Sequence, residues 1–367
     1  MTRFRPTVVE VDLDAVRHNV RLLGRPHVEL LAVVKANGYG HGDAEVARAA
    51  LEEGATGLGV ALVEEGIGLR ERGIDAPILV MTEFPPGSEK EALAAGLTPS
   101  VYSEAGLAAV AEAASAMGRP VGVHLKLDTG MHRVGVWPPE DAPLIARRIV
   151  DSGLLLEALW THFADSEQDA AGTLEQLQRF LSCRDLLATA GIRPRMSHAA
   201  NSGATIRLRE THLDLVRPGA ALYGLDPGAG IGSAFGLRPA LTLRSAVAMT
   251  KRLPAGERLS YGGRYALERE ATIATIPIGY EDGYPRTSVG AEVLIRSRRY
   301  PVAGTITMDQ MLVDCGDDQI TPGDEVVLIG IQGGERITIE EVASRAGMIG
   351  REIATGIGER VPREYVG

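Results

Sequence analysis

The sequence predicts an α/β protein in which a (β/α)8 TIM barrel precedes a mainly β C-terminal domain. Over the first two thirds of the 367 residues, short apolar runs alternate with amphipathic stretches, as expected for βα units that build a parallel sheet. Several of the amphipathic stretches end at a glycine, which is typical of a helix C-terminus. After a Gly/Pro-rich connection around residues 223–239, the runs become β-branched and are separated by turns. We therefore expect a barrel over residues 1–235 and a β domain over residues 236–367.

The first domain contains about eight candidate strands, a number that favours a closed barrel over an open doubly wound sheet. Stretches between them, such as "TLEQLQRFLSCRDLLATAG", repeat leucine near the helical period of 3.6. An earlier run, "TVVEVDL", precedes the first barrel helix and is compatible with pairing in the β domain instead of the barrel. The candidate strands are residues 28–34, 57–61, 78–81, 98–101, 121–127, 155–161, 195–197 and 213–216.

The second domain should consist mainly of strands. Its runs include "ATIATIPIGY", "MLVDCG" and "DEVVLIG", which are rich in β-branched residues. One helix is expected in "TIEEVASRAG", with Thr338 as its N-cap and Glu341 at the capping-box position.

Composition and charge exclude several classes of function. A net charge of -10 argues against a nucleic-acid or acidic-membrane surface, and no apolar stretch approaches the roughly 18 residues that span a bilayer. The N-terminus has no long apolar segment of the kind found in signal peptides. Cys183 and Cys315 lack metal-ligand spacing, so no metal site is expected. Two cysteines of this kind fit buried positions in a cytoplasmic protein.

Polar residues gather where the predicted barrel strands end, which is where barrel enzymes carry their chemistry. Taken singly, each has a structural explanation: a solvated lysine, a structural histidine, a helix cap or a turn. Together they suggest a site, because the loops after the last two strands of such barrels often bind phosphate. The residues at these strand ends are Lys35, Tyr39, Lys126, Asp128, Arg133, His162, His198, Asn201, Ser202, Arg217 and Gly219.

A phosphate site and an amine at one barrel mouth predict a phosphorylated aldehyde held as a Schiff base. Ser202 at a helix start offers a hydroxyl and backbone N–H groups to a phosphate, and Gly219 allows close backbone approach. A strand-end lysine such as Lys35 forms the imine and also moves a proton once desolvation and nearby cations lower its pKa. Pyridoxal 5′-phosphate is the cofactor that this combination indicates.

Nine motifs, in order along essentially the whole chain, resemble those of the alanine racemase family of fold-type III pyridoxal-phosphate enzymes. They are "VVKANGYGHG", "KLDTGMHRVG", "THFA", "ANSGA", "VRPGAALYG", "LSYGGRY", "PIGYEDGYPR", "MDQ" and "RVPR". The resemblance implies racemisation between L- and D-alanine for cell-wall synthesis. It also implies a homodimer with shared active sites.

The resemblance also implies a role for each site residue. Lys35 and Tyr261 would be the two bases on opposite faces of the cofactor. Arg217 would face the pyridine nitrogen, and His162 would lie near Arg217 and Tyr261. The phosphate would be bound by Tyr39, Ser202 and the Gly219 backbone, and Asn201 would also contact the cofactor. The substrate would be bound by Arg133, Met308 and Asp309. Tyr280 would narrow the entrance, and Lys126 would be a candidate for carbamylation.

Elementary chemistry supports this set of roles. Two bases on opposite faces remove and return a proton without turning the substrate. A tyrosine, with a reference pKa of about 10, is a poor base unless cations lie nearby, and Arg133 and the His162–Arg217 pair would supply them. An arginine stays protonated and donates to the ring nitrogen. The ring then withdraws fewer electrons than it would beside a carboxylate, which favours fast reprotonation over transamination.

One departure and several alternatives remain. Some relatives have a tyrosine that contacts the phosphate just before "RVPR", where this chain has Glu359. A carboxylate would repel the phosphate, so we expect Glu359 to point away and the phosphate to have one hydrogen-bond donor fewer.

The alternatives are a racemase of another small amino acid such as serine, a fold-type III decarboxylase, and a non-catalytic pyridoxal-phosphate protein. A second domain that carries Tyr261 and Met308 argues against the last.

Overall fold

A computed structural model describes residues 4–228, 230–288 and 290–367 of the protein. The chain separates into two compact units. The barrel unit is Ala15–Arg238, and the β unit combines the residues before Ala15 with Pro239–Gly367. In the described part of the chain, no helix has the length and apolar character needed to cross a membrane.

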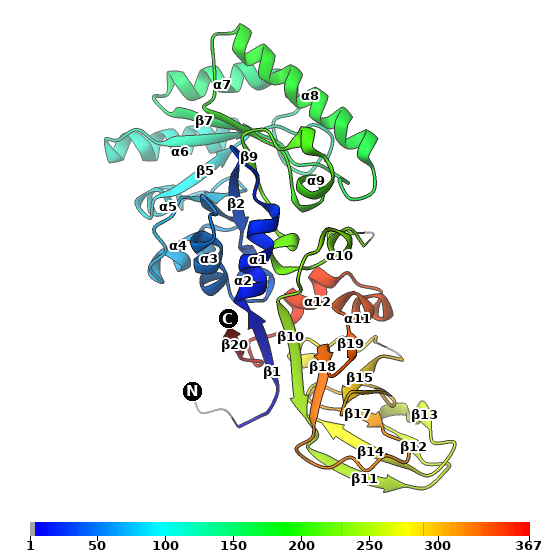
Figure 1. The fold of residues 1–367 in the computed structure, drawn as a ribbon. Helices are drawn as coiled ribbons and strands as arrows, with labels where there is room; N and C mark the ends of the chain where they lie inside the picture. Colours follow the sequence, from blue (N-terminus) through cyan, green and yellow to red (C-terminus); the bar gives the residue numbers. More distant parts are fainter. Residues whose placement is uncertain (1–3, 229, 289) are drawn as a thin grey trace. The chain divides into compact units, whose positions relative to one another are not determined.

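The barrel unit is built on a closed ring of eight parallel strands (Figure 1). Each strand pairs with the next in the chain, and β9 closes the ring by pairing with β2. All eight predicted strands are present, which confirms the predicted fold class. The strands are β2 (Glu29–Val33), β3 (Gly57–Val60), β4 (Ile78–Val80), β5 (Leu97–Val101), β6 (Gly122–Lys126), β7 (Leu155–Trp160), β8 (Met196–His198) and β9 (Leu215–Val216).

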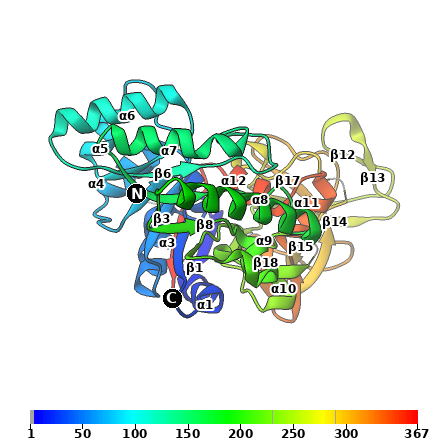
Figure 2. The ribbon, with the colours of Figure 1, turned by 90° about the horizontal axis from the view of Figure 1, so that it is seen from above.

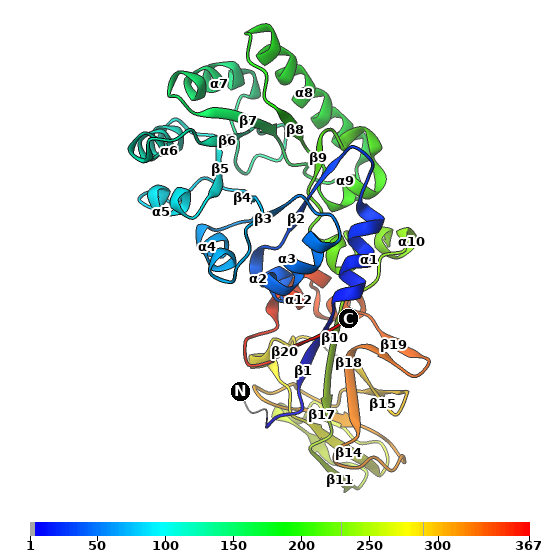
Figure 3. The ribbon, with the colours of Figure 1, turned by 60° about the vertical axis from the view of Figure 1, so that its left-hand side comes forward.

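Helices surround these strands in chain order (Figure 3). Helices α6 and α7 run side by side, and α7 also packs against α8 (Figure 2). The connection that follows the barrel, predicted only as Gly/Pro-rich, contains the short helix α10. The helices are α1 (Leu13–Leu23), α2 (Lys35–Tyr39), α3 (Asp43–Glu52), α4 (Val63–Glu71), α5 (Glu89–Ala94), α6 (Glu104–Met117), α7 (Ala142–Asp151), α8 (Ala170–Thr189), α9 (Ser202–Arg207) and α10 (Ile231–Phe235).

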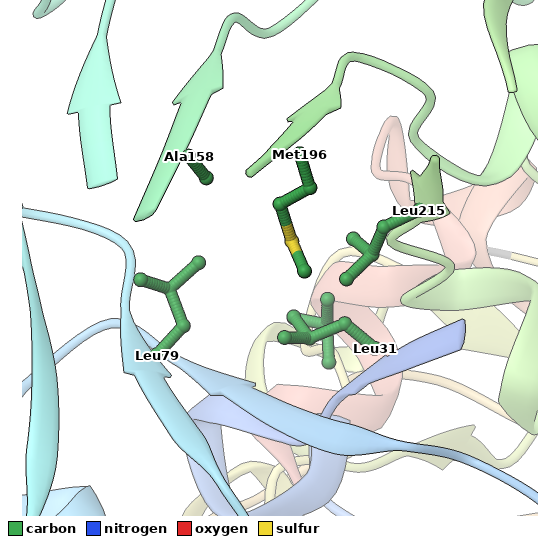
Figure 4. Packing of buried hydrophobic residues seen from close by; sticks show 6 residues of the cluster. Leu31, Leu79, Ala158, Met196 and Leu215 are labelled. Carbon is green, nitrogen blue, oxygen red and sulfur yellow. The ribbon is translucent and has the colours of Figure 1, made fainter. Parts of the chain in front are cut away.

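Apolar side chains from the strands fill the centre of the barrel. They point toward one another from β2, β4, β7, β8 and β9 (Figure 4). A barrel of eight strands is just wide enough for its side chains to fill, so its interior is a packed core and not a pore. The strand ends are therefore left to carry the polar residues. The core residues are Leu31, Val33, Leu79, Ala158, Met196 and Leu215.

The β unit contains one large mixed sheet and two small ones. The path of the large sheet is β16-β15-β18-β10-β1-β20, with β19 paired to β18. The early run "TVVEVDL" contributes β1, which is antiparallel to β10 and parallel to β20. The strands of the large sheet are β1 (Val8–Asp12), β10 (Leu241–Ala246), β15 (Glu292–Ile295), β16 (Arg298–Pro301), β18 (Glu325–Gln332), β19 (Glu335–Ile337) and β20 (Arg363–Val366).

The smaller sheets pack around a separate apolar cluster that includes Leu259, Ile273 and Ala303. One sheet has the order β11-β14-β17 and the other pairs β12 with β13. These strands are β11 (Met249–Leu253), β12 (Arg258–Leu259), β13 (Tyr265–Ala266), β14 (Ala271–Ile276) and β17 (Met311–Asp314).

The helix predicted in "TIEEVASRAG" is α11 (Ile339–Ala346), and α12 (Gly350–Gly356) follows it. The Thr338 hydroxyl accepts a hydrogen bond from the N–H of Glu341 at 3.0 Å, which confirms the predicted N-cap. The Glu341 carboxylate instead pairs with Arg299 at 2.8 Å. Cys183 and Cys315 are buried with free thiols.

Candidate active site

Lys35 opens an unusual turn directly after β2. The next four residues have positive φ: 53° at Ala36, 51° at Asn37, 59° at Gly38 and 51° at Tyr39. They form a left-handed helical turn, which costs energy for residues that have a Cβ atom. The Ala36 N–H donates to Oε1 of Glu65 at 2.7 Å and helps to hold the turn in place. This short turn brings Lys35 and Tyr39 to the same strand end, which explains the glycine-rich stretch that follows the lysine.

Three of the residues predicted to bind phosphate converge on one point of the barrel unit. Ser202 Oγ accepts the N–H of Gly219 at 2.9 Å and the N–H of Ala221 at 3.2 Å, so its own hydroxyl proton is available to an anion. Tyr39 stacks on Tyr223 with ring centroids 5.0 Å apart. A Cβ at Gly219 would lie 2.5 Å from the Tyr39 hydroxyl. Only glycine therefore permits this approach, which supports the prediction for all three residues.

Asn201 has a structural role next to this point. Its side-chain oxygen accepts the N–H of Ala204 at 3.1 Å and the hydroxyl of Ser166 at 2.6 Å, and it caps α9. A contact between Asn201 and the cofactor stays a prediction.

Arg217, directly after β9, is held on one side of its guanidinium by four neighbours. Nη2 donates to the carbonyl oxygens of Thr161 at 2.7 Å and Ala199 at 3.0 Å. It also lies 3.4 Å from Nδ1 of His162. Nη1 lies 2.7 Å from Nδ1 of His198. The remaining nitrogen, Nε, is buried and has no acceptor among the described residues.

Positive charge is concentrated around Trp160 on β7. Nζ of Lys126 lies 4.2 Å from the centre of the Trp160 ring, and the guanidinium carbon of Arg217 lies 4.8 Å from it. Burial, followed by the charges of Arg217, Arg133 and Lys35, lowers the pKa of Lys126 to about 7. Burial lowers the pKa of Arg217 to about 9, which leaves it charged at neutral pH.

His162 belongs to the same electrostatic environment. Burial, followed by the charges of Arg217, Lys126 and Arg133, lowers the pKa of His162 well below its usual value. The ring is therefore neutral at neutral pH. Arg133 itself is exposed, so its predicted substrate contact is sterically open.

Loops of the β unit bring together the residues predicted there. Thr305 Oγ1 donates to the carbonyl oxygen of Tyr261 at 3.0 Å. The N–H of Tyr280 donates to the carbonyl oxygen of Thr307 at 3.0 Å, and the N–H of Glu281 to that of Met308 at 3.1 Å. Residues 305–308 therefore connect the loops of both tyrosines. The Tyr261 side chain is 73% exposed.

A cavity of about 520 Å³ in the β unit lies beside Tyr261. It is lined in addition by Ser260, Gly262, Thr307, Gln310, Met311 and Leu312.

Two further residues named from the sequence lie in the β unit. Asp309 accepts a hydrogen bond from Arg360 at 2.7 Å. Glu359 is exposed. How Glu359 affects cofactor affinity stays a prediction.

Two family models cover the chain. One, described as "Alanine racemase, N-terminal domain", matches residues 11–227, and the other, "Alanine racemase, C-terminal domain", matches residues 240–365. The chain belongs to the alanine racemase family. An alanine racemase from Symbiobacterium thermophilum is 47% identical over 368 residues, which cover 99% of this chain and 98% of that protein.

Solved alanine racemase structures share the fold over the whole chain. The enzyme from D-cycloserine-producing Streptomyces lavendulae has a TM-score of 0.94 at 41% identity and covers 100% of this chain and 98% of its own. The enzyme from Bacillus anthracis with bound L-Ala-P has a TM-score of 0.94 at 36% identity and covers 100% of this chain and 96% of its own. These matches favour the racemase over the decarboxylase and the non-catalytic alternatives.

The barrel unit of this alanine racemase family member fits pyridoxal 5′-phosphate. The convergence of Tyr39, Ser202 and Gly219 suits the phosphate, and Lys35 supplies an amine at the same strand end. The unpartnered Nε of Arg217 is a buried donor that lacks an acceptor, and a pyridine nitrogen is such an acceptor. The barrel unit therefore has hydrogen-bond donors for the phosphate, an amine for the aldehyde carbon and a donor for the ring nitrogen of the cofactor.

Sequence reasoning missed three residues of this site: His124, Trp160 and Tyr223. Each is largely buried and lies in contact with a predicted residue. A signal for His124 was present, because it lies two residues before Lys126 on β6 and alternate residues of a strand share a face.

Proposed function

We propose that the chain is a pyridoxal-phosphate-dependent alanine racemase that interconverts L- and D-alanine by a two-base mechanism. The observation that carries the proposal is the Arg217 guanidinium. Its Nη atoms are held by neighbouring groups, while its buried Nε has no acceptor among the described residues. The amine of Lys35 and the residues predicted to bind phosphate belong to the same barrel unit. Supply of D-alanine for cell-wall synthesis, which the family resemblance implies, and a cytoplasmic location, which the two cysteines suggest, belong to the proposal.

Barrel-unit residues would hold the cofactor in one orientation. Tyr39, Ser202 and the Gly219 N–H would bind the phosphate, Lys35 would bind the aldehyde carbon, and Arg217 Nε–H would donate to the ring nitrogen. When bound, the cofactor withdraws electrons from the substrate α-carbon and so lowers the free-energy cost of removing its proton. Because Arg217 remains protonated, it donates to this nitrogen without transferring its proton.

Lys35 and Tyr261 would exchange protons with the α-carbon from opposite faces. By family resemblance, Tyr261 would come from a second copy of the chain, in a homodimer that shares its active sites. Arg133, the Met308 N–H and Asp309 would bind the substrate, and Tyr280 would narrow the entrance. His162, neutral and next to Arg217, would orient the Tyr261 hydroxyl.

We propose in addition that Lys126 takes up carbon dioxide as a carbamate. Only an unprotonated amine attacks carbon dioxide, and the pKa of Lys126, about 7, provides that form at neutral pH. The amine loses one proton as the N–C bond forms. The anionic product would then pair with the neighbouring Arg133.

Purified protein provides the direct test. We expect visible absorption from bound cofactor, which Lys35→Ala abolishes, together with conversion of D- to L-alanine that falls at least about 1,000-fold in the variant because a base and the covalent link are lost. Lys90→Ala, which truncates an exposed lysine on α5, is the matched control and should behave as wild type. A coloured and active Lys35→Ala variant would contradict the proposal. The same assay with serine measures substrate breadth.

A further inference from the structure

Behind Arg217 lies a line of two buried histidines that the mechanism above does not use. His198, the last residue of β8, has its Nδ1 2.7 Å from Nη1 of Arg217. Its other nitrogen, Nε2, is 3.1 Å from Nδ1 of His124 on β6. The three side chains therefore form a continuous line from Arg217 away from its free Nε.

The chemistry of an arginine determines the proton positions along this line. A guanidinium only donates, so His198 Nδ1 must be unprotonated in order to accept from Nη1. An imidazole with a bare Nδ1 carries its proton on Nε2, and His198 must therefore donate to His124. Nδ1 of His124 is then an acceptor, and its own proton lies on Nε2. Each ring has a single tautomer that satisfies both hydrogen bonds.

Burial and packing maintain this arrangement. Burial and the charge of Arg217 lower the pKa of His198 well below its usual value, and burial and the same charge lower that of His124 to about 3. Both rings are therefore neutral at neutral pH. The Trp160 ring stacks on His198, with centroids 5.5 Å apart and planes inclined by 16°, and so restricts rotation of the histidine.

We propose that His124 is a positioning residue that fixes the tautomer of His198 and, through it, the orientation in which Arg217 presents Nε–H to the cofactor ring. This inference rests on the proposed function only for the identity of the ring. A histidine that donates from one nitrogen becomes a better acceptor at the other, as happens for metal-bound histidines that donate to an outer-shell group. Because His198 donates to His124, its Nδ1 accepts a stronger hydrogen bond from Nη1 of Arg217.

A purely structural His124 would fill space and do nothing more. The two roles differ in which substitution is tolerated. His124→Asn keeps an acceptor oxygen near the place of Nδ1, whereas His124→Leu has the same branched arrangement of side-chain heavy atoms as Asn and lacks the acceptor. A structural role predicts that the two variants behave alike or that Leu, being apolar, is tolerated better. A positioning role predicts that Asn retains function and Leu does not.

The first measurement uses the wild type and needs no activity. Long-range 1H–15N correlation spectra of histidine-labelled protein, with and without pyridoxal 5′-phosphate, distinguish protonated from bare ring nitrogens. Loss of one signal set in His124→Asn assigns that residue, and His198→Gln assigns the other. We expect protonated Nε2 and bare Nδ1 in both rings. A proton on Nδ1 of His198 would overturn the proposal, even if neither His124 variant folded.

The second measurement is the dissociation constant of pyridoxal 5′-phosphate, followed by its visible absorption. We expect it to rise by about tenfold in His124→Leu, as for loss of one buried hydrogen bond, and by less than about threefold in His124→Asn. The value of kcat should fall in the Leu variant, and KM for alanine should change little. Equal losses in the two variants, or none in either, would overturn the proposal. Wild-type protein that binds the cofactor with these tautomers but does not racemise alanine would contradict the proposed function alone.

Discussion

Lys126 is a buried amine among other cations. Its residue is only 4% exposed, its Nζ lies over the Trp160 ring, and three positive side chains contribute to the low pKa. A lysine in this position destabilises the folded state whenever it is protonated there. This loss of stability is consistent with a functional role for Lys126, because an apolar side chain would fill the same space without it.

The pH dependence of stability follows from this low pKa. The pKa of Lys126 is about 7 in the folded protein, and it is about 10.4 in an unfolded chain. Between these two values the unfolded chain binds a proton that the folded protein lacks, so the free energy of unfolding rises with pH through this window. At lower pH the folded protein must keep a buried ammonium, and the cost is largest.

We therefore expect cofactor-free Lys126→Met to be more stable than wild type by about 1–3 kcal/mol near pH 6–7, with a difference that shrinks toward zero near pH 10. Urea denaturation in buffers free of carbon dioxide measures it. Lys90→Met, at an exposed position, should give a small difference at every pH. A difference for Lys126→Met that stays constant over this range would mean that Lys126 keeps its ordinary pKa.

At the scale of elements, the left-handed turn after β2 stores strain. A residue with a Cβ pays about 1–2 kcal/mol for left-handed helical angles, which glycine avoids. Ala36 has such angles, and its side chain is exposed. The strain is borne by the segment that positions Lys35 and Tyr39, as is common at functional sites.

Ala36→Gly should accordingly stabilise the protein by up to about 1 kcal/mol, because relief of strain exceeds the roughly 0.5–1 kcal/mol that a more flexible unfolded chain costs. Ala108→Gly, at an exposed position inside α6, is the control and should destabilise by about 1 kcal/mol. Chemical denaturation measures both. If both variants lose stability equally, the turn is not strained.

Prediction from sequence succeeded for elements with a local signal. The barrel strands are buried on both faces, so they appear as apolar runs, and their predicted bounds differ from β2–β9 by only a few residues. The left-handed geometry at Ala36 has no such signal, because alanine ordinarily favours the right-handed helix. The strand alternation with Lys126 placed His124 on the same face, but its partner could not be predicted, because the contact with His198 joins strands 74 residues apart in the chain.

At the scale of the whole molecule, the proposed mechanism requires two chains. Lys35→Ala and Tyr261→Phe homodimers would each lack one base in every site. A heterodimer would contain one site with neither base and one site with both, so about half of the heterodimer sites should regain wild-type activity. Co-expression with two different affinity tags isolates the heterodimer for assay.

Dilution gives an independent measurement of the same requirement. Activity should fall at concentrations below the dissociation constant of the dimer, because a lone chain would lack one base. Isolated heterodimers that remain inactive would mean that Tyr261 acts within its own chain or is not a base.

The position of β1 between β10 and β20 in the large sheet has a consequence for how the protein is made. Thr7, just before β1, hydrogen-bonds to Ser245 from 238 residues further along the chain. At about 5–20 residues per second, a ribosome needs roughly 12–48 s to cover that distance, and β20 emerges later still. The barrel segment, Ala15–Arg238, is completed only near the end of this interval, just before β10 emerges, and until then the first strand has no partner. A nascent-chain experiment would therefore find the N-terminus protected from proteases only after the whole barrel segment has emerged, and fully only once β20 has emerged.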